Sequence, residues 1–122
     1  MNKLTLNEIV GYLPYKLQVL ESYNNRIGVL HSINVNGKVS VLHKVIWDFE
    51  IEEIKPILNR IEDMSEELLD KWIYIQERVE NNLQFSIKAN EFMYSNHIDI
   101  HNLIDRGLAV DAKTLNTHTN VK

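Results

Sequence analysis

The sequence IGVLHSINVNGKVSVLHKVIW, residues 27–47, decides the fold. Branched apolar residues dominate it on both sides of Asn36-Gly37. This pair is the strongest short-range signal for a two-residue hairpin turn, because a type I′ turn needs a positive φ at both positions. We therefore predict antiparallel strands over residues 27–35 and 38–47. The two-residue loop would pair Val35 with Lys38 and His31 with Leu42.

Two further elements are predicted before this hairpin. Residues 16–22 alternate between apolar and polar side chains, as a third strand would. Thr5 and Glu8 match the capping box, in which each side chain accepts a hydrogen bond from the backbone N–H of the other residue. A short helix over residues 6–13 should follow this box, and Pro14 should end it.

The second half of the chain carries helical signals. Ser65 is a good N-cap, and apolar residues with the 3.6-residue period follow it, so we predict a helix over residues 65–82. A second helix is predicted over residues 85–96. A third, over residues 100–106, should end at Gly107, where a left-handed residue usually follows a helix.

The segment between the two halves is ambiguous. Residues 48–60 fit either a helix interrupted by Pro56 or a short extended piece over residues 55–58. A chain of 122 residues is long enough to form one domain with its own core. The predicted fold is a single α+β domain over residues 1–122, made of a short N-terminal helix, a three-stranded antiparallel sheet with an Asn-Gly hairpin (about 15–47), a helical C-terminal half (about 65–107) and a frayed tail (116–122).

Composition excludes several classes of function. The chain has no Cys, which removes disulfides, thiolate zinc sites and Cys nucleophiles. Its 13 basic and 17 acidic residues give a net charge of −4, which argues against direct general nucleic-acid binding. Since no stretch of 18 apolar residues occurs and residues 1–13 lack a signal-peptide layout, we expect no membrane association and a cytoplasmic location. We expect a monomer or a small homo-oligomer.

Catalytic signals are sparse. His97 and His101 are four residues apart, so on a helix they would share a face and could hold one metal ion, with Asp99 or Asp105 nearby. The Glu of a His-Glu-x-x-His motif is absent, and neither a Gly-x-Ser-x-Gly motif nor a Gly-rich phosphate loop occurs. We therefore predict no enzyme, no cofactor and no metal site, with a small metal-dependent hydrolase using this His pair as an alternative.

Charge is distributed unevenly along the chain. Residues 1–47 carry five basic and two acidic side chains, whereas residues 48–80 carry four basic and eleven acidic ones. An acidic surface can steer a small protein to a basic groove of a partner. The alternative is an ordinary solvated helix face, supported by an i,i+4 pair of Glu67 with Lys71. The predicted partner-binding residues are Glu66, Glu67, Asp70, Tyr74 and Glu77.

Tyrosines give a second hint of an interaction surface. Tyr is favoured at protein interfaces, and all five tyrosines lie near the predicted ends of elements, where a hydroxyl group can stay in water. Tyr74 lies off the apolar stripe of its helix, so among the five we expect this residue above all to be exposed. These residues are Tyr12, Tyr15, Tyr23, Tyr74 and Tyr94.

Three motifs carry a family resemblance that extends over most of the chain. They are LPYKLQVL (13–20), KPILNRIEDMSEEL (55–68) and HIDIHNLIDRGLAVDAKTLN (97–116). The chain resembles a family of small proteins of unassigned function from phages and prophages of Bacteroidota, which carry Leu-Pro-Tyr-Gly-Leu, Lys-Pro-Ile-Leu and an ending close to His-Phe-Asp-Val-Phe-x-Leu-Ile-x-x-Gly-Leu-Ala-Ile-Asp. Lys16, Ile98 and His101 depart from this pattern. The departure at His101 further weakens a metal site.

The resemblance implies an accessory protein of a mobile genetic element. Small prophage proteins of this kind include anti-CRISPR proteins, and the chain is similar in size and character to one that acts on the type VI-B RNA-guided RNase. The resemblance therefore implies a non-enzymatic inhibitor that binds a CRISPR effector nuclease or its guide-RNA complex in the host cell. The alternative is a phage structural or replication accessory protein that binds another phage protein.

Overall fold

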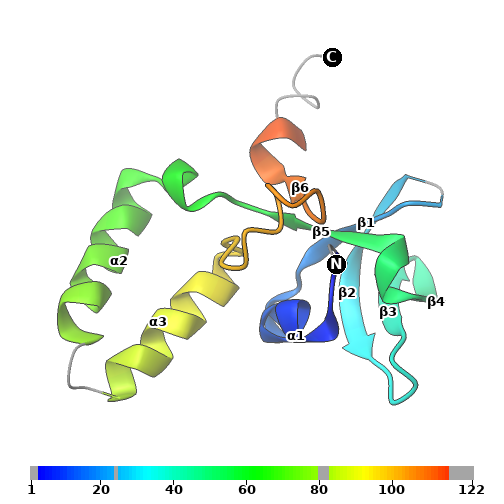
Figure 1. Cartoon of the computed structure of the whole chain (residues 1–122), viewed down its shortest axis with the longest axis horizontal. Helices are drawn as coiled ribbons and strands as arrows, with labels where there is room; N and C mark the ends of the chain where they lie inside the picture. The colour runs from blue at the N-terminus through cyan, green and yellow to red at the C-terminus, as the bar shows by residue number, and fades with distance from the viewer. Residues whose placement is uncertain (1–2, 24, 80–82, 116–122) are drawn as a thin grey trace.

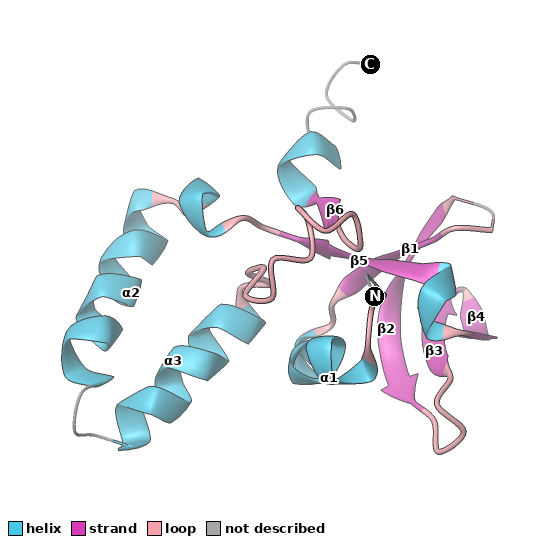
Figure 2. Ribbon diagram, viewed as in Figure 1, coloured by secondary structure: helices cyan, strands magenta, loops and turns pink. Residues whose placement is uncertain are grey.

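The computed structural model describes residues 3–23, 25–79 and 83–115, and it confirms the α+β class (Figures 1 and 2). The predicted tail at 116–122 lies outside these residues. The elements in chain order are α1 (Leu6–Ile9), the 3-10 helix η1 (Val10–Tyr15), β1 (Gln18–Glu21), β2 (Arg26–Ile33), β3 (Val39–His43), β4 (Val45–Phe49), the 3-10 helix η2 (Ile51–Glu53), β5 (Ile54–Leu58), the 3-10 helix η3 (Ile61–Asp63), α2 (Glu66–Val79), α3 (Leu83–Ser95) and β6 (Val110–Asp111).

The sheet has six strands in the order β4-β3-β2-β1-β5-β6, so the predicted three-stranded sheet is wrong in its extent. All neighbours are antiparallel except β5 and β6. The predicted strand over 38–47 is two strands, because Lys44 takes a φ of 66° and turns the chain back so that His43 lies opposite Val45. The extended alternative for 55–58 is confirmed as β5, which pairs with β1.

The Asn36-Gly37 turn is present, but the predicted two-residue loop is wrong. The backbone N–H of Asn34 donates to the carbonyl of Lys38 at 2.8 Å, which leaves a three-residue loop with Gly37 at a φ of 85°. Such loops place Gly in the left-handed position. An irregularity in β2 shifts the register again. The observed pairs are Ile33 with Val39 and Val29 with Leu42, in place of Val35 with Lys38 and His31 with Leu42.

The hydrophobic core lies between one face of the sheet, the α1–η1 segment and the residues around Leu103. Tyr12, predicted to keep its hydroxyl in water, is instead fully buried. Its hydroxyl donates to the carbonyl of Ile98, and its ring meets the Tyr94 ring edge-on at 4.7 Å between centroids. Burial raises the pKa of Tyr12, so the hydroxyl stays protonated. The buried core residues are Leu4, Ile9, Tyr12, Leu17, Val19, Leu30, Val39, Val41, Ile54, Leu58 and Leu103.

The helix starts follow the predicted caps. Thr5 and Glu8 form the predicted capping box, but α1 gives way after four residues to η1, which continues past Pro14. Ser65 accepts a hydrogen bond from the N–H of Leu68 and caps α2. The two long helices therefore begin and end close to their predicted positions.

The third predicted helix, over residues 100–106, is wrong. This segment forms turns, in which the carboxylate of Asp99 accepts hydrogen bonds from the N–H groups of Leu103 and Ile104 at 2.8 and 2.9 Å. A side chain that accepts hydrogen bonds from backbone N–H groups replaces the backbone hydrogen bonds that a helix would form there. Gly107 has the predicted left-handed conformation, with a φ of 77°.

The helices α2 and α3 form an antiparallel pair, the helical hairpin, which stands away from the sheet (Figure 1). Its main contact with the rest of the fold lies at the end of α3, where the Tyr94 ring packs against Gly11 and Tyr12 of η1. The sheet edge at β4 lies at the far end of the molecule from α2 (Figure 1). None of the helices within the described ranges is long and apolar enough to cross a membrane.

Candidate protein-interaction surface

The predicted partner-binding residues lie on one exposed side of α2. Glu66, Asp70 and Glu77 project from the same side because their spacing matches whole turns of the helix. Glu67 and Tyr74 lie beside them, and Tyr74 is 54% exposed. We call Glu66, Glu67, Asp70 and Glu77 the acidic face of α2. The predicted exposure of Tyr74 is confirmed, and Tyr23, at 80%, is exposed as well.

Basic side chains of α2 compensate only part of this acidic face. Lys71 forms the predicted i,i+4 ion pair with Glu67, at 3.4 Å between exposed groups. Arg78 lies over the Tyr74 ring, with its guanidinium carbon 3.7 Å from the ring centroid. Within the ranges that the structure describes, no salt bridge involves Glu66, Asp70 or Glu77. The net charge that α2 presents to solvent is therefore negative.

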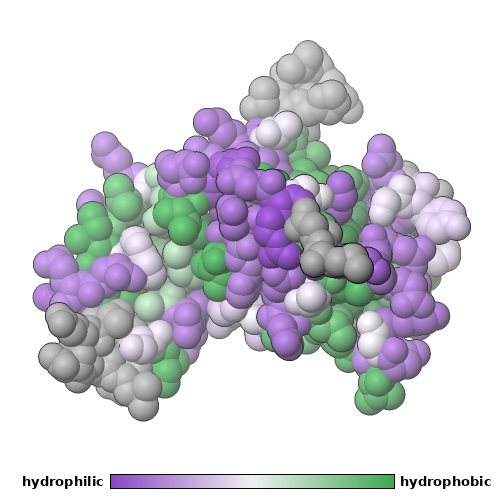
Figure 3. Space-filling view, viewed as in Figure 1, coloured by the Kyte–Doolittle hydropathy of each residue, from purple (hydrophilic) through white to green (hydrophobic). Residues whose placement is uncertain are grey.

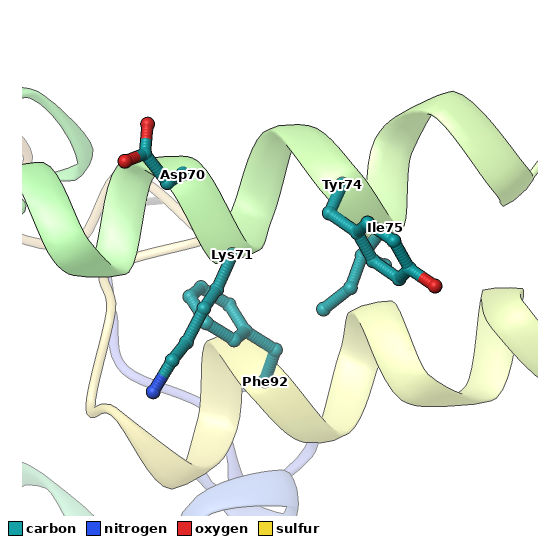
Figure 4. A pocket seen from close by; sticks show the side chains of 5 residues that line it. All are labelled: Asp70, Lys71, Tyr74, Ile75 and Phe92. Carbon is teal, nitrogen blue, oxygen red and sulfur yellow. The ribbon is translucent and has the colours of Figure 1, made fainter.

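An open apolar groove runs beside the acidic face, between α2 and α3. Its volume is about 420 Å³, and Asp70, Lys71, Tyr74, Ile75 and Phe92 line it. Figure 4 shows the Asp70 carboxylate directed away from α3, whereas the side chains of Tyr74 and Ile75 extend toward it. The groove therefore has an apolar floor and a charged rim, an arrangement typical of protein-binding sites.

The helical hairpin exposes further apolar side chains that the sequence analysis did not assign to the surface. Trp72 stacks on Phe92 at 5.7 Å between ring centroids and holds the two helices together. Leu69 and Ile73 of α2 and Ile87 of α3 are each about half exposed. Figure 3 shows hydrophobic residues on this part of the surface, beside hydrophilic ones. Their signal in the sequence is an apolar stripe wider than two paired helices can bury.

The alternative site at His97 and His101 is not assembled. Since α3 ends at Ser95, the two residues do not share a helix face, and His97 takes a φ of 54°. The His97 Nε2 lies 2.8 Å from the carbonyl of Tyr15, whereas the His101 Nε2 lies 3.5 Å from the Tyr94 hydroxyl. No cluster of three or more His, Cys, Asp or Glu suited to a metal ion occurs in the described part of the chain.

Comparisons with known proteins do not assign the chain to a family. The chain matches no protein-family model, no curated protein and no solved structure. The resemblance to phage and prophage proteins therefore stays a prediction that rests on three sequence motifs.

Proposed function

We propose that the chain is a non-enzymatic inhibitor that binds a CRISPR RNA-guided nuclease of type VI-B in the host cytoplasm. One observation carries the proposal: the acidic face of α2 borders an exposed apolar groove on a helical hairpin that stands clear of the sheet. RNA-guided nucleases hold their nucleic acids in positively charged channels. A negatively charged helix matches the sign of such a channel.

The charged and apolar parts of the surface have different roles in this proposal. Exposed charges such as Glu66 and Asp70 act over a distance of about 8–10 Å and mainly raise the rate of association. The half-exposed apolar side chains Ile73 and Tyr74 would supply affinity when a partner covers them, because aromatic and apolar groups at the centre of an interface carry most of its energy. The resemblance supplies the class of partner.

A cleavage titration tests the proposal. Guide-loaded type VI-B RNase is mixed with increasing amounts of the full chain, and the cleavage rate of target RNA is measured. A stoichiometric inhibitor stops cleavage near one equivalent of chain to nuclease. Complete inhibition far below one equivalent would mean that the chain acts as an enzyme. No inhibition and no binding, with or without guide RNA, would favour the phage accessory protein.

A further inference from the structure

The strand β4 is an edge of the sheet with unusually exposed apolar side chains. Val45, Ile46 and Trp47 are 57%, 52% and 42% exposed. Within the described ranges, β3 is the only strand that pairs with β4, so the outer edge of β4 presents unpaired backbone groups. Natural proteins normally protect such edges with charges at the centre, with proline or with a covering segment. The centre of β4, residues 45–47, contains neither a charged residue nor a proline.

The charges that flank β4 are complementary to those of a second β4 in the opposite direction. Lys44 precedes the strand, Asp48 lies near its end, and Glu50 follows it. An antiparallel pair of β4 strands with its two-fold axis at Ile46 places Lys44 opposite Asp48 of the other copy. With the axis at Trp47, the same lysine lies opposite Glu50. A parallel pair would instead align like charges, which is unfavourable.

We infer that β4 pairs antiparallel with β4 of a second copy of this chain, which joins the two six-stranded sheets edge to edge. The new pairing would satisfy the outer backbone groups of β4 and bring apolar residues of the two copies together across the axis. Because the strand has only five residues, the contact is smaller than a standard protein interface. The dimer should therefore be reversible and depend on concentration.

The dimer is independent of the proposed function. The helical hairpin lies at the other end of the molecule from β4, so pairing at β4 leaves the acidic face of α2 free (Figure 1). A test of self-association needs no nuclease. Failure of the inhibitor proposal and failure of the dimer proposal are therefore separate results.

Sedimentation equilibrium over a wide range of concentrations gives the first test. The mass of the wild-type chain should rise from 14.3 kDa toward twice that value. Ile46→Lys, which puts a charge at the centre of the edge, should stay at the monomer mass. Ile73→Lys changes a similarly exposed isoleucine of α2 and should dimerise as the wild type does. A wild-type chain that stays monomeric throughout, or an Ile46→Lys variant that dimerises normally, would overturn the inference.

A charge reversal tests the direction of the pairing. Lys44→Glu places like charges together at both ends of the antiparallel pair and should weaken the dimer by about tenfold. Lys16→Glu is the matched control, since Lys16 is also an exposed lysine with a positive φ, 54° against 66° for Lys44. The control should change the dissociation constant by less than about twofold. Equal effects of the two reversals would contradict the proposed pairing, as would tighter association of Lys44→Glu.

Discussion

The sheet core and the helical hairpin bury their apolar residues to very different extents. In the core, Ile9, Tyr12, Leu17 and Leu103 have no exposed surface. In α2, every residue whose side chain the structure describes is at least partly exposed. Two paired helices can cover only one stripe of each other, so the remaining apolar surface of the hairpin stays in water.

The stability of the fold therefore depends mainly on the sheet core, whereas the proposed recognition surface lies on the helical hairpin. The core residues come from both ends of the chain, so truncating one of them should destabilise the whole domain. The hairpin is attached through the end of α3, so it can open locally at a smaller free-energy cost. Substitutions in the two regions should therefore differ in size and in how far their effects spread.

The largest effect is expected at Tyr12. Tyr12→Ala removes a fully buried ring and its hydrogen bond to Ile98, and should lower the free energy of unfolding by about 3–5 kcal/mol. Urea denaturation measures this change. Tyr12→Phe keeps the ring and should lower the free energy of unfolding by only about 1 kcal/mol. A Tyr12→Ala variant as stable as the wild type would show that the core does not hold the fold together.

A smaller and more local effect is expected at Trp72. Trp72→Ala removes the stacking contact with Phe92, but the ring is only partly buried, so the cost should be about 2 kcal/mol, roughly half of a fully buried aromatic. Hydrogen exchange should quicken in α2 and α3 and stay unchanged in β1 and β2. Uniformly faster exchange over the whole chain would mean that the hairpin and the core unfold as one unit.

Gly107 should contribute to the stability of the domain through its backbone conformation alone. Its φ is 77°, and a Cβ atom built there would meet no atom within 4 Å. Gly107→Val should therefore destabilise the domain by about 1–2 kcal/mol, the usual cost of a left-handed L-residue. Gly107→Asn should be milder, since Asn tolerates this conformation. Equal melting temperatures of the Val variant and the wild type would contradict the assigned turn.

The smallest effect is expected at Glu8 and appears only in acid. Burial raises the pKa of Glu8, but hydrogen bonds from Arg106 and Thr5 outweigh it and hold the pKa below its ordinary value of 4.5. Ionised Glu8 therefore stabilises the folded state above pH 4.5, and this stabilisation is lost as the pH falls through the lower pKa of Glu8 in the folded state. Glu8→Gln should flatten this part of the melting-temperature profile between pH 6 and 3. If the melting temperature of Glu8→Gln falls with pH as steeply as that of the wild type, Glu8 does not contribute to stability in this way.

The sequence predicts those parts of the fold that have a local signal. The capping box at Thr5, the cap at Ser65, the Asn36-Gly37 turn and the left-handed Gly107 each depend on a few neighbouring residues, and each is present. The exposed acidic residues of α2 could also be predicted, because charge and helical spacing can be read directly from the chain.

The remainder of the fold depends on contacts that leave no local pattern. The turn at Lys44 has no Gly, Asn or Pro at its centre, so the sequence predicts a single strand where the structure has β3 and β4. The pairing of β1 with β5 joins segments more than 30 residues apart. The burial of Tyr12 depends on a carbonyl group 86 residues away. The groove between α2 and α3 likewise follows from the packing of two helices.

Two matched charge reversals test whether the acidic face of α2 binds the nuclease. Glu66 and Asp70 are changed to Lys together, and Glu52 with Glu62, two exposed acids outside α2, are changed in the same way as a control of equal charge. Both variants should melt close to the wild-type temperature. The dissociation constant for the guide-loaded type VI-B RNase should rise at least about tenfold for the α2 variant, mainly through slower and less salt-dependent association, and by less than about twofold for the control. Equal binding of the two variants would show that the acidic face of α2 is not the surface that binds the nuclease.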